Sequence, residues 1–203
     1  MTNEKPTVLI VFEGLDQSGK ETQARRLAES LAAEGRRVET LSFPDYETPI
    51  GREIGAALAG EREFPPDVMQ LLYIANRYEW RPKIEQWLRE GAVVVCDRYA
   101  ASSIAYGESH GLDAAWLDAA QQYLPRADLT FVLDIAPETA SARKRTGRDK
   151  YERDMALLSR VRASYRRQAT QLGWTVVDGE QPKDAIAAEI ARVVAARLAD
   201  EQN

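Results

Sequence analysis

Cysteine and histidine are almost absent from this chain, which contains one of each. A single cysteine, Cys96, cannot form an internal disulfide, and the chain has no Cys/His cluster that could hold a structural zinc ion. These absences exclude a disulfide scaffold and a zinc module. Because Cys96 directly follows a run of valines, we predict that it lies in a buried strand.

Long hydrophobic runs and an excess of positive charge are also missing. No apolar run approaches the roughly 20 residues that a membrane-spanning helix needs, and residues 1–6 lack the apolar segment of a signal peptide. We therefore expect a cytoplasmic protein without a membrane partner. The formal net charge is −5, whereas general nucleic-acid binders rely on many Lys and Arg side chains, so we expect no nucleic-acid partner.

Short apolar runs alternate with longer helical patterns along the 203 residues. This alternation is typical of a parallel sheet with helical crossovers. We predict one α/β domain with a five-stranded parallel sheet and helices on both faces. The expected strands are 8–13, 37–42, 93–96, 129–133 and 174–177.

Helices are predicted from apolar residues at helical spacing. The clearest covers residues 20–34 and should end at Gly35. Others are expected around residues 116–124, over 155–172 and after Pro182. A helical stretch begins near Pro66, and we expect Pro82 to end or kink it.

The strongest single motif follows the first expected strand and directly precedes a helix. It is the loop Gly14, Leu15, Asp16, Gln17, Ser18, Gly19, Lys20, Glu21 and Thr22. In such loops, backbone N–H groups and the helix N-terminus bind phosphate oxygens, while the lysine places a positive charge at the β- and γ-phosphates. We therefore predict that these residues bind ATP.

One position of the loop departs from the usual motif. Glu21 stands where a Ser or Thr hydroxyl normally binds Mg²⁺. The neighbouring Thr22 is the candidate to take over that role, so Mg²⁺ remains the expected cofactor. Because an inward carboxylate would repel the phosphates, we expect Glu21 to point toward solvent.

A phosphate loop alone does not distinguish a kinase from a GTPase or a motor ATPase. The GTPase hypothesis requires an Asn-Lys-x-Asp segment, which the sequence lacks. A second signal is Asp97-Arg98, directly after the expected strand 93–96, at the edge of the sheet where α/β proteins bind ligands. The Asp97 carboxylate could reach the Mg²⁺ shell, and the Arg98 guanidinium could donate to two phosphate oxygens. The alternative to this functional interpretation is a surface ion pair that caps the strand.

Four segments share the order and spacing of one family. They are Phe12-Glu13-Gly14-Leu15-Asp16 through Lys20, Phe43-Pro44-Asp45-Tyr46, Leu72-Tyr73-Ile74-Ala75-Asn76-Arg77, and Asp97-Arg98-Tyr99-Ala100-Ala101-Ser102-Ser103-Ile104-Ala105-Tyr106. Together they resemble the thymidylate kinase family of nucleoside-monophosphate kinases, and the resemblance implies the P-loop NTPase fold with a lid. The resemblance implies phosphorylation of dTMP to dTDP with Mg-ATP, in dTTP biosynthesis, by a homodimer.

The resemblance also implies a dTMP site. Arg98 would hold the phosphate of dTMP, Tyr73 would stack on thymine, Arg77 would donate to a thymine carbonyl, and Tyr106 would lie close to the sugar 2′ position. The full predicted set is Asp16, Phe43, Tyr46, Tyr73, Arg77, Arg98, Ser102, Ser103 and Tyr106. From the residues alone, Tyr73, Tyr106 and Phe43 could instead be core side chains, and Arg77 could be a helix-surface ion-pair partner.

Residues 143–153 contain six Lys or Arg side chains and no continuous apolar stripe. Such a run is usually a solvated face, but its place in the predicted fold favours a lid over the donor phosphates. The resemblance implies that a lid arginine, Arg143, Arg145 or Arg148, acts with Lys20 and Arg98 in catalysis. It also implies that Glu152 approaches the metal site predicted at Asp16, Thr22 and Asp97.

Two alternatives to a monophosphate kinase stay open from the sequence. A deoxynucleoside kinase would need a carboxylate base near its acceptor hydroxyl, which Glu13 or Asp97 could supply. A non-catalytic nucleotide-binding module would bind ATP without a working acceptor site. ADP formation that depends on a nucleoside monophosphate would separate these possibilities.

Overall fold

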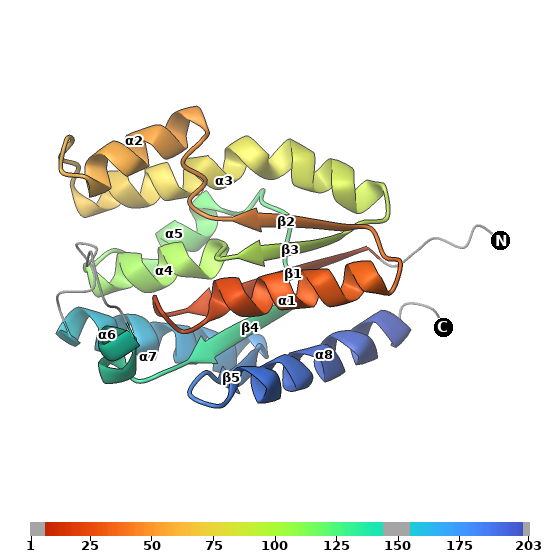
Figure 1. The fold of residues 1–203 in the computed structure, drawn as a ribbon. Helices are drawn as coiled ribbons and strands as arrows, with labels where there is room; N and C mark the ends of the chain where they lie inside the picture. Colours follow the sequence, from red (N-terminus) through yellow and green to blue (C-terminus); the bar gives the residue numbers. More distant parts are fainter. Residues whose placement is uncertain (1–6, 144–154, 201–203) are drawn as a thin grey trace.

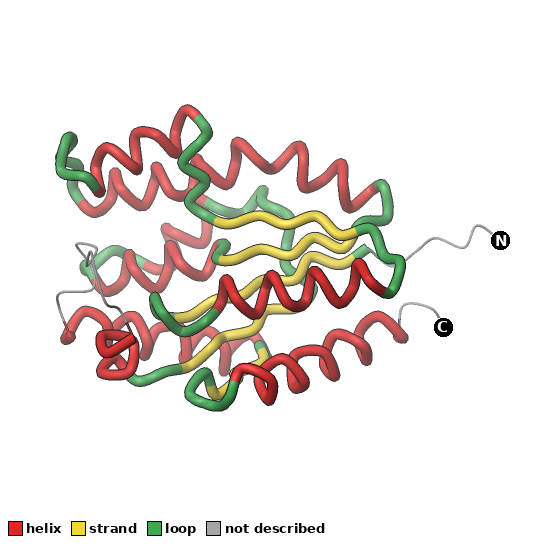
Figure 2. The backbone as a smooth tube through the Cα atoms, in the orientation of Figure 1, coloured by secondary structure: helices red, strands yellow, loops and turns green. Residues whose placement is uncertain are grey.

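A computed structural model describes residues 7–143 and 155–200. Within these residues one parallel sheet has the strand order β2-β3-β1-β4-β5 (Figures 1 and 2). Its strands are β1 (Val8–Gly14), β2 (Val38–Ser42), β3 (Val93–Asp97), β4 (Leu129–Asp134) and β5 (Thr175–Asp178). The predicted five-stranded parallel sheet is therefore confirmed.

Helices cover both faces of the sheet. The helices are α1 (Lys20–Ala33), α2 (Pro49–Leu58), α3 (Pro66–Arg89), α4 (Ala100–Ser109), α5 (Ala114–Ala120), α6 (Pro137–Arg143), α7 (Met155–Leu172) and α8 (Lys183–Asp200). Helices α1 and α8 pack on one face, and α3, α4 and α7 pack on the other (Figure 1). Within the described ranges, no helix is long and apolar enough to cross a membrane.

The alternation of side chains along β1 explains its unbroken apolar sequence. Val8, Ile10 and Phe12 face the core under α1 and α8, whereas Leu9 and Val11 face the core that includes α3. Successive side chains of a strand point to opposite faces, and in this parallel sheet both faces are covered. Cys96 of β3 is fully buried, as predicted.

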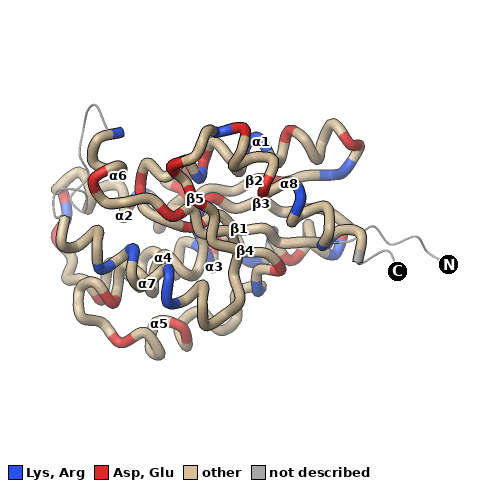
Figure 3. Tube along the Cα trace, turned by 90° about the horizontal axis from the view of Figure 1, so that it is seen from below, with Lys and Arg blue, Asp and Glu red and all other residues tan. Residues whose placement is uncertain are grey.

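Basic and acidic residues are interspersed along the helices (Figure 3). Arg25 pairs with Glu29 along α1, and Arg26 of α1 pairs with Asp184 of α8. Each of these exposed pairs contributes little to stability. Because both signs of charge occur on α1 and α8, the surface of these two helices is neither uniformly positive nor uniformly negative.

Of the two outcomes expected at Pro82, an end of the helix or a kink, the first is wrong, because α3 continues from Pro66 to Arg89. Beyond the proline, Ile84 and Trp87 are buried against the sheet, and this packing offsets the one backbone hydrogen bond that a proline removes. The helix predicted around residues 116–124 ends at Ala120, and Tyr123 beyond it is exposed.

Candidate active site

Two pockets lie at the carboxyl ends of β1 and β3, where the sequence places its phosphate loop and Asp97-Arg98. One lies over the phosphate loop and extends to the segment before α8. The other lies between α3, α4 and the segment after β2. Asp16 and Arg98 line both pockets, so the two cavities meet at these side chains.

The phosphate loop turns through backbone conformations that favour glycine. Gly14 has a φ of 134°, and a Cβ added there would lie 2.4 Å from the carbonyl oxygen of Leu133 on β4. Gly19, with a φ of 96°, precedes the first residue of α1. These conformations let the loop fold closely against the sheet and lead directly into the helix N-terminus.

Lys20 lies inside the curl of the loop. Its Nζ donates to the carbonyl oxygen of Leu15 at 2.6 Å, and the side chain is 5% exposed. Glu21 is exposed, and both Glu21 and Thr22 line the loop pocket, so the expected outward direction of the Glu21 carboxylate stays a prediction. Leu15 departs from the expected ATP-binding set in one respect, because its side chain packs in the core and only its backbone serves the loop.

Asp97 brings an unpaired oxygen to this pocket. Its Oδ1 is buried and has no hydrogen-bond partner among the described residues. Burial raises the pKa of the Asp97 carboxyl to about 6, while the nearby charge of Lys20 acts in the opposite direction. An unpaired carboxylate oxygen beside a phosphate loop fits Mg²⁺, which usually takes one or two protein ligands and completes its shell with phosphate and water.

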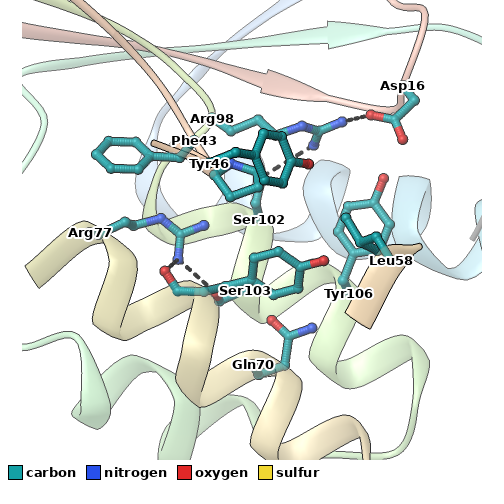
Figure 4. Close-up of a pocket in the computed structure, with 12 residues that line it drawn as sticks. Asp16, Phe43, Tyr46, Leu58, Gln70, Arg77, Arg98, Ser102, Ser103 and Tyr106 are labelled. Carbon is teal, nitrogen blue, oxygen red and sulfur yellow. Dashed lines mark hydrogen bonds and ion pairs between the residues drawn. The ribbon is translucent and has the colours of Figure 1, made fainter. Parts of the chain in front are cut away.

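Arg98 occupies the junction of the two pockets in an unusual backbone conformation. Its φ is 64°, in the left-handed region, and its N–H donates to the carbonyl oxygen of Phe12 at 2.9 Å. The guanidinium pairs with Asp16 and donates to the carbonyl oxygen of Gly14 at 3.2 Å and to Ser102 Oγ at 3.3 Å (Figure 4). The side chain is therefore held across the end of the phosphate loop.

Glu13 organises the start of α4 next to Arg98. The carboxylate is fully buried and accepts hydrogen bonds from the backbone N–H groups of Tyr99 at 2.8 Å and Ser102 at 3.3 Å. It also accepts from Ser102 Oγ at 2.6 Å and Tyr165 Oη at 3.2 Å. With its oxygens engaged in this way, Glu13 is poorly suited to act as the base of a deoxynucleoside kinase.

Replacing Glu13 with alanine is expected to lower the free energy of unfolding by about 2–4 kcal/mol, because buried N–H groups of Tyr99 and Ser102 would lose their acceptor. Urea denaturation would measure the change. Glu29→Ala is the control, since Glu29 pairs with Arg25 on an exposed face and should contribute less than about 1 kcal/mol. Equal stability of the two variants would contradict the role given to Glu13.

Every residue predicted to bind dTMP lines the second pocket, and Figure 4 shows how they converge on it. Among the described residues, Pro44, Leu58 and Gln70 also line it and were not predicted. Pro44 lies within a segment that supported the resemblance. Leu58 and Gln70 had no local signal, since α2 was not predicted and Gln70 is a single polar residue on a long helix.

Arg77 is a buried cation rather than a helix-surface residue. Only 3% of it is exposed, and its Nη1 donates to Ser103 Oγ at 2.7 Å and to Gln121 Oε1 at 3.4 Å. Its guanidinium lies 6.0 Å from the centre of the Phe43 ring. Desolvation lowers the pKa of Arg77, but arginine has so high a starting pKa that it stays charged.

Part of the predicted lid lies within the described residues. Arg143 ends α6 and donates to the carbonyl oxygens of Gln17 at 3.3 Å and Gly179 at 3.0 Å, so it borders the loop pocket. The other predicted residues of this segment, Arg145, Arg148 and Glu152, lie outside the described residues. The loop pocket is also lined by Gln181 and Pro182, which precede α8, and by Lys183, its first residue; none of the three belongs to a predicted motif.

Comparison with known proteins agrees with this geometry. The thymidylate kinase family profile matches residues 12–190. The chain is 34% identical to thymidylate kinase of Homo sapiens over 184 residues, covering 90% of this chain and 87% of the human protein. Thymidylate kinase of Arabidopsis thaliana is 34% identical over 186 residues, covering 92% of this chain and 70% of the plant protein.

A solved structure extends the match to three dimensions. Thymidylate kinase from Candida albicans superposes with a TM-score of 0.83 and 28% identity, covering 95% of this chain and 92% of the other. Sequence and fold therefore agree over nearly the whole length. The chain belongs to the thymidylate kinase family, whose members phosphorylate dTMP to dTDP with ATP.

Proposed function

We propose that this chain transfers the γ-phosphoryl group of Mg-ATP to the phosphate of dTMP where its two pockets meet. The observation that supports this most directly is that Asp16 and Arg98 line both the phosphate-loop pocket and the pocket formed by the predicted dTMP residues. Donor and acceptor phosphates bound in the two pockets would approach each other there. An in-line displacement needs such an approach.

On the donor side, the loop N–H groups and the N-terminus of α1 bind the phosphates, and Lys20 neutralises charge on the β- and γ-phosphoryl groups. Thr22 and Asp97 would hold Mg²⁺, with Asp16 nearby. When bound, Mg²⁺ neutralises charge on the transferring phosphoryl group. Asp97 supports this assignment because its Oδ1 is buried without a hydrogen-bond partner in the described part of the chain.

On the acceptor side, Arg98 holds the phosphate of dTMP, while Tyr73 supplies the aromatic face for thymine and Arg77 donates to a thymine carbonyl. The second pKa of a phosphate monoester is about 6, so the acceptor is mostly a dianion at neutral pH and needs no general base. An acceptor oxygen forms the bond to the γ-phosphorus as the bond to the bridging oxygen of ADP breaks. The residues therefore act by positioning and by neutralising charge.

Arginines of the 143–153 segment complete the proposed donor site. Arg143 supports this role through its contacts with the backbone of Gln17 and Gly179. Separate alanine variants of Arg143, Arg145 and Arg148 would show which one lowers kcat most. A lid function for the whole segment stays a prediction.

The experiment that tests the proposed function is an acceptor screen. Purified protein is mixed with Mg-ATP and, separately, dTMP, dUMP, dCMP, dGMP, AMP, CMP and UMP, and ADP release is followed by a coupled assay. We expect the highest kcat/KM with dTMP and no turnover without Mg²⁺. Highest activity with another monophosphate would contradict the acceptor assignment, and ADP release that needs no acceptor would contradict the transfer itself.

Discrimination between dTMP and dUMP is a separate prediction. One methyl group in an apolar pocket is worth roughly 1–3 kcal/mol, and Phe43 and Leu58 contribute apolar surface here. We therefore expect kcat/KM for dUMP to be about tenfold or more below that for dTMP, yet measurable. Equal values would show that no side chain of the pocket recognises the 5-methyl group.

We also propose a homodimer, as the resemblance implied. The chain mass is 22.7 kDa, so light scattering at micromolar concentration should give about twice that value. A mass equal to one chain would contradict the proposal. The cytoplasmic location stays a prediction that cell fractionation tests.

A further inference from the structure

Gln70 is a buried polar side chain in the acceptor pocket, and no role has yet been assigned to it. It lies on α3, is 2% exposed and lines the pocket. Its Oε1 is buried and has no hydrogen-bond partner within the described residues. Buried polar atoms are nearly always paired, so an unpaired acceptor facing a binding pocket indicates that a ligand supplies the partner.

The position of Gln70 places it in line with the base-binding residues of α3. Gln70, Tyr73 and Arg77 are spaced three and four residues apart, so their side chains lie along one face of the helix. This face meets α4, where Arg77 bonds to Ser103. One α4 turn beyond Ser103, the Cγ of Gln70 would lie 3.5 Å from a Cβ added to Gly107.

Gln70 lies about one turn before Tyr73 on α3 and Arg77 about one turn after it, so polar side chains flank this aromatic residue along the helix. Figure 4 shows the Gln70 amide directed into the pocket, on the side where Ser103 and Tyr106 lie. A Cβ added to Gly107 would lie only 2.3 Å from Leu117 Cδ1, so Leu117 and the stem of Gln70 pack against the bare backbone of α4 at this position.

Gln70 and Arg77 each bring to this pocket a buried atom without a hydrogen-bond partner among the described residues, and the two atoms have complementary hydrogen-bonding characters. Arg77 Nε is a buried donor without a partner in the described part of the chain, and Gln70 Oε1 is a buried acceptor. The edge of thymine presents carbonyl acceptors on either side of an N3–H donor. An arginine donor can pair with a carbonyl, while the N3–H requires an acceptor.

We propose that Gln70 determines base specificity by accepting a hydrogen bond from thymine N3–H, with Arg77 on a neighbouring carbonyl. The inference rests on the proposed function, because it needs dTMP in this pocket. It adds a residue outside the set implied by the family resemblance. Among the side chains that line the pocket, Gln70 Oε1 is a buried amide oxygen without a hydrogen-bond partner in the described part of the chain, whereas Ser103 Oγ is already bonded to Arg77.

The test uses a substrate that lacks only this donor, the 3-deaza analogue of dTMP, in which C–H replaces N3–H. A substrate donor or buried acceptor left unpaired costs roughly 1–3 kcal/mol, so the wild-type protein should prefer dTMP over the analogue by about 5- to 150-fold in kcat/KM. In Gln70→Leu the preference should fall to within about threefold of unity. The activity on dTMP should fall while that on the analogue changes little.

Matched controls make the outcome specific. Gln86→Leu, the same change at an exposed position of α3, should keep the wild-type preference. Ser103→Ala should also keep it, because Ser103 is not assigned the N3–H contact. The melting temperature of Gln70→Leu should be no lower than that of wild type, since the substitution removes a buried unpaired oxygen. If the leucine variant fails to fold, Gln70→Met is used in its place.

The outcomes separate this inference from the proposed function. If wild type phosphorylates dTMP and Gln70→Leu keeps its preference for dTMP over the analogue, the role of Gln70 is wrong. Loss of the preference in Ser103→Ala with retention in Gln70→Leu would assign the contact to Ser103 instead. Failure of wild type to use dTMP at all would overturn the proposed function itself.

Discussion

Replacing Lys20 with alanine is expected to lower kcat by about a thousandfold while the protein remains folded. A preorganised positive charge that acts on the developing charge of a transition state is worth about 10²–10³ in kcat. Lys20 is 5% exposed and held inside the loop by the carbonyl oxygen of Leu15, so its ammonium group is fixed before ATP binds. Steady-state assays with saturating ATP and dTMP would measure the loss.

Two comparisons keep this result interpretable. Lys83→Ala removes an exposed lysine on α3 and should leave kcat unchanged. Thermal melting should show Lys20→Ala within a few degrees of wild type, because only one side chain at the rim of the core is lost. A folded Lys20→Ala variant whose kcat stays within tenfold of wild type would contradict the proposed role.

Replacing Arg98 with alanine should lower kcat/KM for dTMP by at least a hundredfold, mainly through a higher KM for dTMP. Truncating one partner of a buried charge pair costs about 2–5 kcal/mol, and the dTMP phosphate would lose the guanidinium proposed to bind it. Asp16 would also lose its ion-pair partner. The KM for ATP should change much less than that for dTMP, which distinguishes the two phosphate sites.

Two further variants sharpen the Arg98 experiment. Arg98→Lys keeps the charge but cannot bind two phosphate oxygens through a planar fork, so it should recover only part of the lost kcat/KM. Arg166→Ala removes an arginine whose side chain is 61% exposed and should behave like wild type. An Arg98→Ala variant with unchanged dTMP kinetics would remove Arg98 from the acceptor site.

The parts of this protein that the sequence predicted well are contiguous and local. The phosphate loop follows an apolar strand and precedes a helix, and its turn is closed locally by the Ser18 N–H donating to the carbonyl oxygen of Leu15 at 3.2 Å. Asp97 and Arg98 directly follow a run of apolar residues that can only be a covered strand. The predicted dTMP residues come from segments far apart in the chain, and they line one pocket because family spacing reflects a shared fold.

The helix predictions that failed or were missing have one cause in common. Tertiary packing, and not the local preference of the residues for helix or turn, determined where these helices form and end. Pro82 is unfavourable within a helix, yet α3 continues because Ile84 and Trp87 gain burial against the sheet. The short helices α2 and α6 were not predicted, because each is only a few turns long and its apolar residues contact distant segments. Single-sequence periodicity carries no information about those contacts.

By itself, the sequence determined the class of chemistry, since a glycine-containing loop with Lys20 and a strand ending in Asp97-Arg98 have few other uses than binding phosphate and metal. Only the tertiary structure decided how these groups cooperate. Parallel pairing of β1 with β3 brings Asp16 to Arg98, and the packing of α3 on α4 buries Gln70 with an acceptor left unpaired. A polar side chain can be exposed to solvent or buried in a pocket where only a ligand can pair with it. Which of these holds depends on the residues around it in space, and its neighbours in sequence do not specify them.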